Sequence, residues 1–197
     1  MNNVGILDIG LGNLQSVASA LQALEVSHTV MSRPEDVGSS RWIVLPGVAN
    51  VKHYLAALVE TGWDGLLRAQ AGQEIRVLGI CAGAQVLFDS LEEGGASGLG
   101  LIPGQVVRLP GRRPNIGWRL VPGLDDGKGS AKPHFYFNHG YHLVPESQHM
   151  KTYTSIGPHG ASIVGLLSWE GGVAVQFHPE KSHRYGMRLL RNFLDLV

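Results

Sequence analysis

The chain of 197 residues has one cysteine, Cys81, and no excess of either charge, with 16 basic and 16 acidic side chains. One cysteine excludes an internal disulfide and a multi-thiolate metal site. Balanced charge without a charged tail gives no support to a nucleic-acid partner. Because 44% of the residues are hydrophobic and 16% are charged, a chain of this length can bury a sizeable core. We expect one globular domain over residues 1–197.

Long hydrophobic runs are also missing. No stretch reaches the ~18 apolar residues that a transmembrane helix needs, so we expect no membrane partner. The N-terminal stretch MNNVGILDIG has no basic region ahead of a long apolar segment, unlike a secretory signal. These absences predict a cytoplasmic protein.

The hydrophobic pattern predicts alternating strands and helices in the first half of the chain. Strands are expected at 4–10, 27–32, 41–48 and 75–80, and helices at 13–25, 50–62 and 84–95. This alternation is typical of a parallel sheet with helices on both faces. Further strands are expected at 104–110, 115–121, 134–144, 152–156 and 161–178, the last with a hairpin near Glu170–Gly172, before a helix at 184–197. Residues 122–133 are predicted to form a surface loop.

Three familiar binding motifs are incomplete. GLGNLQ has Gln15 where the dinucleotide fingerprint needs its third glycine, and in DDGKGS Lys128 is followed by Gly129 instead of Ser or Thr. His139 and His142 are three residues apart in an expected strand and should point to opposite faces. Without an HExxH pattern either, we expect no nicotinamide, phosphate-loop or metal site.

The stretch IRVLGICAGAQ has the form of a nucleophile elbow, in which a strand, Gly-x-Cys-x-Gly and a helix follow one another. Gly79 and Gly83 keep the tight turn free of clashes. The turn holds Cys81 at the carboxyl edge of the sheet, where ligands bind, and at a helix N-terminus, which favours the thiolate. The alternative is a small buried cysteine beside an ordinary glycine-rich turn.

A histidine and a carboxylate that could serve this thiol occur in VAVQFHPEKS. An apolar strand ends at His178, and Pro179 keeps the backbone extended. Side chains two apart in an extended segment point the same way, so Glu180 can reach the imidazole. A nucleophilic thiol uses a histidine oriented in this manner. The alternative is a surface histidine beside a solvated glutamate.

GICAGAQ, with FHPE about a hundred residues later, resembles the class I (triad) glutamine amidotransferases. The blocks DIGLGNLQSV, LPGV, LFDSLEEGG, PNIGWR, YFNHGY and QFHPEKS span nearly the whole chain in an order similar to that of the glutaminase subunits of imidazole glycerol phosphate synthase. The resemblance implies a three-layer, flavodoxin-like α/β fold with a mixed, mostly parallel sheet.

The resemblance also implies a reaction. Cys81 would attack the side-chain amide of L-glutamine to form a γ-glutamyl thioester, and His178, oriented by Glu180, would protonate ammonia and then activate water. Ammonia would pass to a cyclase subunit, a (β/α)₈ barrel in a heterodimer, which makes imidazole glycerol phosphate and an aminoimidazole carboxamide ribotide in histidine biosynthesis. No metal or organic cofactor is implied.

Further roles follow by position from the same resemblance. Glu93 would hold the amino group of the substrate; the alternative is a solvated charge at a helix end. Trp118 would face the partner; the alternative is a core aromatic. The implied substrate-binding residues are Gly47, Gln85, Glu93, Gly140 and Tyr141; the implied oxyanion loop is Val48, Ala49 and Ala82; the implied partner interface is Asn13, Trp118, Asn138 and Lys181.

The sequence departs from the family pattern at several positions. Ala49 replaces a glycine of the oxyanion loop, which makes a positive φ harder to adopt, and loss of one oxyanion donor can slow a reaction by ~100- to 1000-fold. Ala82 and Ala84 replace Leu and Met, HGYH replaces His-Ser/Thr-Tyr, and GWR replaces GWN. Three alternatives therefore stay open: another ammonia acceptor such as a sugar amidotransferase, a catalytically silent regulatory module, and a hydrolase of γ-glutamyl peptides.

Overall fold

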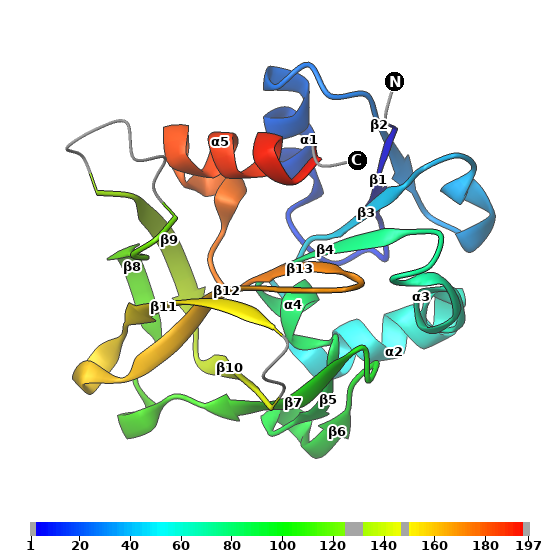
Figure 1. Cartoon of the computed structure of the whole chain (residues 1–197). Coiled ribbons are helices and arrows are strands. Elements are labelled where there is room, and N and C mark those ends of the chain that lie inside the picture. The colour runs from blue at the N-terminus through cyan, green and yellow to red at the C-terminus, as the bar shows by residue number, and fades with distance from the viewer. Residues whose placement is uncertain (1–2, 125–131, 147–149, 195–197) are drawn as a thin grey trace.

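The main sheet has seven strands in the part of the chain that the structure describes. The computed structural model describes residues 3–124, 132–146 and 150–194. The strand order is β11-β12-β13-β4-β3-β1-β2 (Figure 1). In chain order the strands are β1 (Val4–Leu7), β2 (His28–Met31), β3 (Trp42–Leu45), β4 (Arg76–Ile80), β11 (Lys151–Ile156), β12 (Ser162–Trp169) and β13 (Gly172–Val175). The five strands from β13 to β2 are parallel, whereas β12 and β11 are antiparallel. The expected mixed, mostly parallel sheet is confirmed.

Helices cover both faces of this sheet. Helices α1 (Leu14–Ala23) and α5 (His183–Leu194) lie on one face, and α2 (Val51–Thr61), α3 (Trp63–Gln70) and α4 (Ala82–Gln85) lie on the other (Figure 1). Successive side chains of a strand point to opposite faces. In β3, Ile43 and Leu45 therefore pack in the core below α2 and α3, while Trp42 and Val44 pack in the core below α1 and α5. The expected three-layer arrangement is confirmed.

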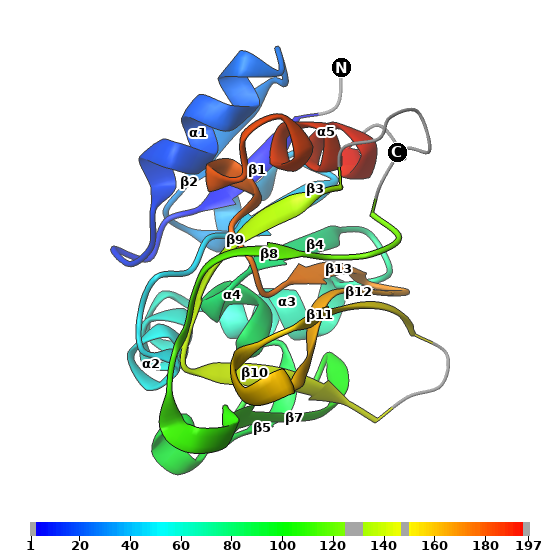
Figure 2. The same ribbon diagram turned by 90° about the vertical axis from the view of Figure 1, so that its left-hand side faces the viewer.

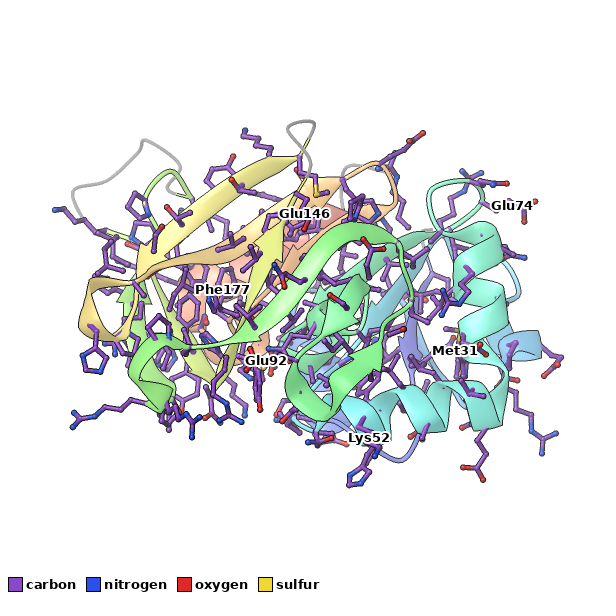
Figure 3. All side chains as sticks on the ribbon, turned by 90° about the horizontal axis from the view of Figure 1, so that it is seen from below. Met31, Lys52, Glu74, Glu92, Glu146 and Phe177 are labelled. Carbon is purple, nitrogen blue, oxygen red and sulfur yellow. The ribbon has the colours of Figure 1, made fainter. Side chains whose placement is uncertain are left out.

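Two smaller sheets complete the described part of the fold. One has the order β10-β7-β5-β6, formed by β5 (Phe88–Leu91), β6 (Ala96–Ser97), β7 (Ile102–Arg108) and β10 (Tyr141–Pro145). It lies beside α2, which carries Lys52 (Figure 3). The other pairs β8 (Asn115–Leu120) with β9 (His134–His139), and both cross in front of the main sheet in Figure 2. Short 3₁₀ helices are η1 (Pro34–Val37), η2 (Glu93–Gly95), η3 (Pro110–Arg112), η4 (Pro158–Gly160) and η5 (Pro179–Lys181).

The helix expected at 84–95 is wrong. Helix α4 ends at Gln85, and the chain then forms β5 and η2. Val86, Leu87 and Phe88 are all fully buried. Three consecutive buried side chains do not fit one stripe of a surface helix, and Phe88 pairs with Ile102 of β7 instead.

The single strand expected at 134–144 is also wrong, because Gly140 divides it into β9 and β10, which belong to different sheets. His139 and His142 therefore do not share a strand, and the premise that placed them on opposite faces fails. The hairpin near Glu170–Gly172 is confirmed by the pairing of Trp169 with Gly172.

The helix end expected at Gly62 is confirmed by its left-handed φ of 78°. Helix α3 was not predicted. Most of the predicted loop 122–133 and the last three residues of the predicted C-terminal helix lie outside the described residues. No helix in the described part of the chain is long and apolar enough to cross a membrane.

Candidate active site

The candidate nucleophile lies where three parallel strands end side by side. In the register of the main sheet, Leu45 pairs with Gly79, and Val175 pairs with Ile80. Strands β3, β4 and β13 therefore finish at the same edge, and Cys81 follows β4 directly. The carboxyl edge of a parallel sheet is where α/β proteins bind ligands. The loop after β3 and the segment after β13 meet the cysteine there.

Cys81 occupies a strained turn. Its φ is 52° and its ψ is −108°, a conformation that costs a non-glycine residue of the order of 1–3 kcal/mol. The turn is fixed on both sides, since the Cys81 N–H donates to the Val175 carbonyl over 2.8 Å and the Cys81 carbonyl accepts from the Gln85 N–H over 3.0 Å. This is the backbone geometry of the predicted nucleophile elbow.

Glycines allow the elbow to pack this closely. A Cβ on Gly79 would lie 2.7 Å from the Ala84 Cα, and one on Gly83 would lie 2.0 Å from the Leu45 carbonyl oxygen. The requirement for small residues at both positions is confirmed. A Cβ on Gly47 would lie 2.3 Å from the backbone nitrogen of Gly83. Gly47 is thus buried beneath the elbow and does not line the cavity beside Cys81.

His178 and Glu180 form a buried pair next to the cysteine. Nδ1 of His178 donates to Oε1 of Glu180 over 2.8 Å, and their side chains are 1% and 2% exposed. Within the described residues, Nε2 of His178 has no hydrogen-bond partner, so this nitrogen is available to the thiol.

The same pair controls the protonation of His178. Burial lowers the pKa of His178, but the adjacent Cys81 sulfur, the hydrogen bond to Glu180 and the negative charge on both partners raise it by more than burial lowers it, to about 9. At neutral pH the imidazole is therefore protonated beside the cysteine. A protonated histidine next to a cysteine favours the thiolate, which is the nucleophilic form.

A small cavity of about 170 Å³ opens beside Cys81. This volume is below the roughly 300–1,000 Å³ of sites for drug-sized ligands, which favours a small substrate. The elbow, the loop after β3, η2 and the β9–β10 junction form its walls. The lining residues are Val48, Ala49, Cys81, Ala82, Gln85, Glu93, Asn138, His139, Gly140 and Tyr141. All the expected substrate-binding and oxyanion residues except Gly47 are brought together here.

Glu93 links the cavity to the loop after β3. Its Oε2 accepts from the backbone N–H of Val51 over 3.0 Å, at the start of α2. The carboxylate is therefore held in place and is not a free charge on a solvated face. Gly47, Val48 and Ala49, which precede α2, all have negative φ.

The four residues expected at a partner interface lie around the same edge. Asn13 caps α1 by accepting from the Ser16 N–H over 3.4 Å, and Lys181 belongs to η5, which follows His178. Asn138 is exposed at the cavity. Trp118 is 41% exposed and is thus no core aromatic; its ring stacks on His183 with centroids 5.0 Å apart.

Three buried polar residues near the cavity were not predicted, namely His139, Asn115 and Gln176. Nδ1 of His139 donates to the Tyr141 carbonyl over 2.7 Å, and Nε2 accepts from the Asn115 amide over 3.0 Å. Burial lowers the pKa of His139 to about 4, so it is neutral. Gln176 is fully buried, and a glutamine inside the apolar run VAVQF was the sequence signal for it.

No group of three or more His, Cys, Asp or Glu side chains in the described part of the chain is arranged to hold a metal ion. The cavity presents the Cys81 thiol and the Glu93 carboxylate, with the His178 imidazole beside the thiol.

Comparison with known proteins defines the class. The family model described as "Glutamine amidotransferase class-I" matches residues 5–197. A crystal structure of a glutamine amidotransferase shares the fold, with a TM-score of 0.78 and 21% identity over 98% of this chain and 97% of that one. PurLQS from Thermotoga maritima also has a TM-score of 0.78, at 15% identity over 99% and 98% of the two chains. The chain belongs to the class-I glutamine amidotransferases.

Curated relatives narrow the assignment to one family within this class. The imidazole glycerol phosphate synthase subunit HisH of Desulfitobacterium hafniense (strain Y51) is 39% identical over 96% of this chain and 92% of the relative. The proteins of the same name from Moorella thermoacetica and Geobacillus thermodenitrificans are 37% and 34% identical over all of this chain and 96% and 97% of their own lengths. Within its class, the chain belongs to the HisH family.

Proposed function

We propose that this protein is the glutaminase subunit of an imidazole glycerol phosphate synthase and that Cys81 is its nucleophile. The observation that carries the proposal is the position of the buried His178–Glu180 pair beside a strained cysteine at the wall of a small cavity. The full-length similarity to HisH proteins supports the particular reaction. An intact triad disfavours a silent regulatory module.

In the first half of the proposed reaction, the Cys81 thiolate attacks the side-chain amide carbon of L-glutamine. A C–S bond forms, and the carbonyl oxygen becomes an oxyanion. His178, protonated because its pKa is about 9, gives the proton on Nε2 to the amide nitrogen. The C–N bond breaks, ammonia leaves, and a γ-glutamyl thioester remains on the sulfur.

In the second half, His178 is neutral and acts as a base. Its Nε2 removes a proton from water, the resulting hydroxide attacks the thioester carbon, and the C–S bond breaks. Glutamate leaves, and the thiolate–imidazolium pair is restored. Glu180 accepts from Nδ1 in both halves, so it keeps the ring oriented and stabilises the imidazolium.

The cavity supplies groups that suit the substrate. We assign the α-ammonium of glutamine to the Glu93 carboxylate, and its α-carboxylate to the backbone at Gly140 and Tyr141. The side-chain carbonyl would face the N–H groups of Ala82 and of the Val48–Ala49 loop. Donors aimed at a developing oxyanion are commonly worth ~100-fold or more in rate.

The proposed partner is a cyclase subunit with a (β/α)₈ barrel, bound as a heterodimer and receiving the ammonia. An apolar surface beside the site supports this assignment, because Val48, Ile116 and Trp118 are 51%, 54% and 41% exposed. Asn13, Asn138 and Lys181 lie on the same edge and would contribute polar contacts at the rim. An apolar centre with a polar rim is typical of protein interfaces.

The assignment of Cys81 can be tested by covalent labelling. A glutamine analogue with a diazoketone in place of the side-chain amide, 6-diazo-5-oxo-L-norleucine, should alkylate Cys81 alone, as read by mass spectrometry of the peptides. Free glutamine should protect the cysteine, and His178→Asn should slow labelling. A folded protein whose cysteine is not modified, or whose modification glutamine does not slow, would contradict the proposal.

A further inference from the structure

Gln176 is a fully buried amide next to the proposed nucleophile. It follows β13 directly, and its backbone N–H donates to the Gly165 carbonyl over 2.9 Å. The neighbouring residues in this segment, from Val173 to Phe177, are otherwise apolar. Burying an amide costs ~1–3 kcal/mol unless its hydrogen bonds are replaced. The partners of this side chain therefore indicate what it contributes.

Both ends of the Gln176 amide have partners in the site. Its oxygen Oε1 accepts from Nε2 of Gln85 over 3.3 Å. Its nitrogen Nε2 donates to the sulfur of Cys81 over 3.8 Å, which is hydrogen-bonding distance for sulfur. The side chain thus connects a cavity-lining glutamine to the reacting atom.

The direction of these hydrogen bonds is fixed by a backbone carbonyl. The backbone carbonyl oxygen of Tyr141 can only accept, and Nε2 of Gln85 lies 3.1 Å from this oxygen. Gln85 must therefore present its nitrogen on this side, and the same NH₂ group meets Oε1 of Gln176. This leaves the nitrogen of Gln176 facing Cys81. From Gln176 the sulfur therefore receives an N–H donor and does not face the side-chain oxygen Oε1.

A second chain of contacts holds the same carbonyl in place. His139 also donates to the Tyr141 oxygen, and Asn115 donates to the other ring nitrogen of His139. The oxygen of the Asn115 side chain in turn accepts from Nε of Arg119 over 3.0 Å. A guanidinium has donors only, so it fixes the orientation of Asn115 as well.

The sulfur has one further polar neighbour of opposite character. The carbonyl oxygen of Asn138 lies 3.8 Å from Sγ and can only accept. A neutral thiol can donate to this carbonyl, whereas a thiolate cannot. The Gln176 N–H instead favours the thiolate over the thiol, because a hydrogen bond to a charged acceptor is stronger than one to a neutral acceptor.

We propose that Gln176 is a second donor to the nucleophile, independent of the His178–Glu180 pair. It stabilises the Cys81 thiolate, holds its side-chain rotamer at the cavity wall, and stabilises the same thiolate as it leaves the thioester. This role rests on the proposed function of Cys81 as the nucleophile. It adds a residue outside the triad and gives Gln85 a supporting role through its contact with Gln176.

The pH dependence of alkylation at Cys81 tests this role directly, because the chain has no other cysteine that could react. The rate of carbamidomethylation by iodoacetamide is measured from pH 5 to pH 10 in the absence of glutamine. Gln176→Met keeps the volume but has no donor, and Gln176→Asn keeps an amide but shortens the side chain. Gln105→Met is the control, since Gln105 is an exposed residue of β7.

For Gln176→Met we expect the midpoint of the alkylation profile to rise, with a rate below the midpoint about tenfold lower than in the wild type. Glutaminase kcat should fall by about the same factor, and KM should change little. Gln176→Asn should also raise the midpoint of the alkylation profile and lower kcat. The alkylation profile of Gln105→Met should match that of the wild type. If one substitution at 176 prevents folding, the other supplies the measurement.

Failure of this inference is distinct from failure of the proposed function. If both folded variants at 176 have the wild-type alkylation profile and kcat, Gln176 does not assist the thiolate, and Cys81 remains the nucleophile. If Cys81→Ala hydrolyses glutamine as fast as the wild type, the proposed function itself is wrong, and the role of Gln176 falls with it.

Discussion

His178 and Glu180 are joined by a hydrogen bond of 2.8 Å between Nδ1 and Oε1, with both side chains almost completely buried. They are two residues apart, on either side of Pro179, in a segment that leaves the main sheet beside Cys81. The carboxylate has no other hydrogen-bond partner in the described residues for its Oε2 atom. Among the residues that the structure describes, the Glu180 side chain therefore makes its hydrogen bond to the His178 imidazole alone. This makes the pair the most specific part of the proposed site.

Glu180→Gln should slow the reaction without weakening substrate binding. The neutral amide stabilises the imidazolium less and can present a donor to Nδ1, which favours the wrong tautomer. We expect kcat to fall by about 100-fold or more, while KM changes less than about threefold. Steady-state glutamate production measures both values. A change confined to KM would contradict the orienting role.

Cys81→Ala should abolish glutamine hydrolysis and leave the fold intact, because the strained backbone at residue 81 is held by its neighbours and not by the sulfur. Cys81→Gly should also be inactive, but more stable than Cys81→Ala by about 1 kcal/mol, since glycine adopts a positive φ without penalty. Urea unfolding compares the two variants. Equal stability would show that the elbow is not strained, and retained activity would exclude Cys81 as the nucleophile.

Ala49→Gly should raise the glutaminase rate. Ala49 lines the cavity, and neither it nor Val48 has a positive φ, so a rearrangement that turns an N–H of this loop toward the oxyanion is harder with alanine than with glycine. We expect kcat to increase by up to ~100-fold at a cost in stability of about 0.4–1 kcal/mol. Ala57→Gly, on the partly exposed side of α2, controls for a general effect of glycine. An unchanged kcat would show that the loop already presents its donors.

His139 should make the protein sensitive to acid. Burial lowers its pKa to about 4, whereas the unfolded chain has the ordinary value of 6.5. The unfolded state therefore takes up the proton first as pH falls below about 6.5, and stability is lost until about pH 4. The loss is of the order of 3 kcal/mol.

His139→Gln provides the comparison for this effect, because it retains a donor and an acceptor but does not titrate. Urea unfolding at pH 7.0, 5.5 and 4.5 should show the wild type losing more stability than the variant at each step. Parallel pH profiles for the two proteins would mean that His139 titrates normally.

The sequence allowed the edge of the sheet that carries the candidate site to be predicted, because the determinants of this edge are local. The turn at Cys81 depends on Gly79 and Gly83, and His178 and Glu180 are only two residues apart. The extended segment expected to hold both residues is wrong, because His178 is extended but Pro179–Lys181 forms the 3₁₀ helix η5. The contact between the two side chains forms nevertheless. The order of parallel strands then brings the two segments together, as expected for a doubly wound sheet.

The features that the sequence did not predict depend on strand pairing and hydrogen bonds between segments that are distant in the chain. Phe88 joins a strand because β7 lies beside it, although the sequence after Cys81 also suits a helix. The break at Gly140 arises because β9 pairs with β8 and β10 pairs with β7. The hydrogen bonds of Gln176 and His139 likewise join segments between which no sequence pattern specifies a contact.

Glutamate release from L-glutamine is the most direct test of the central claim that Cys81, His178 and Glu180 form a glutaminase serving a cyclase subunit. The purified protein and its Cys81→Ala variant would be assayed alone and with an imidazole glycerol phosphate cyclase subunit and its nucleotide substrate. We expect glutamate release by the wild type, strong stimulation by the cyclase and its substrate, and no release by the Cys81→Ala variant. Two results would contradict this claim: a folded wild-type protein that releases no glutamate in this mixture, or a Cys81→Ala variant that releases glutamate as fast as an active wild type.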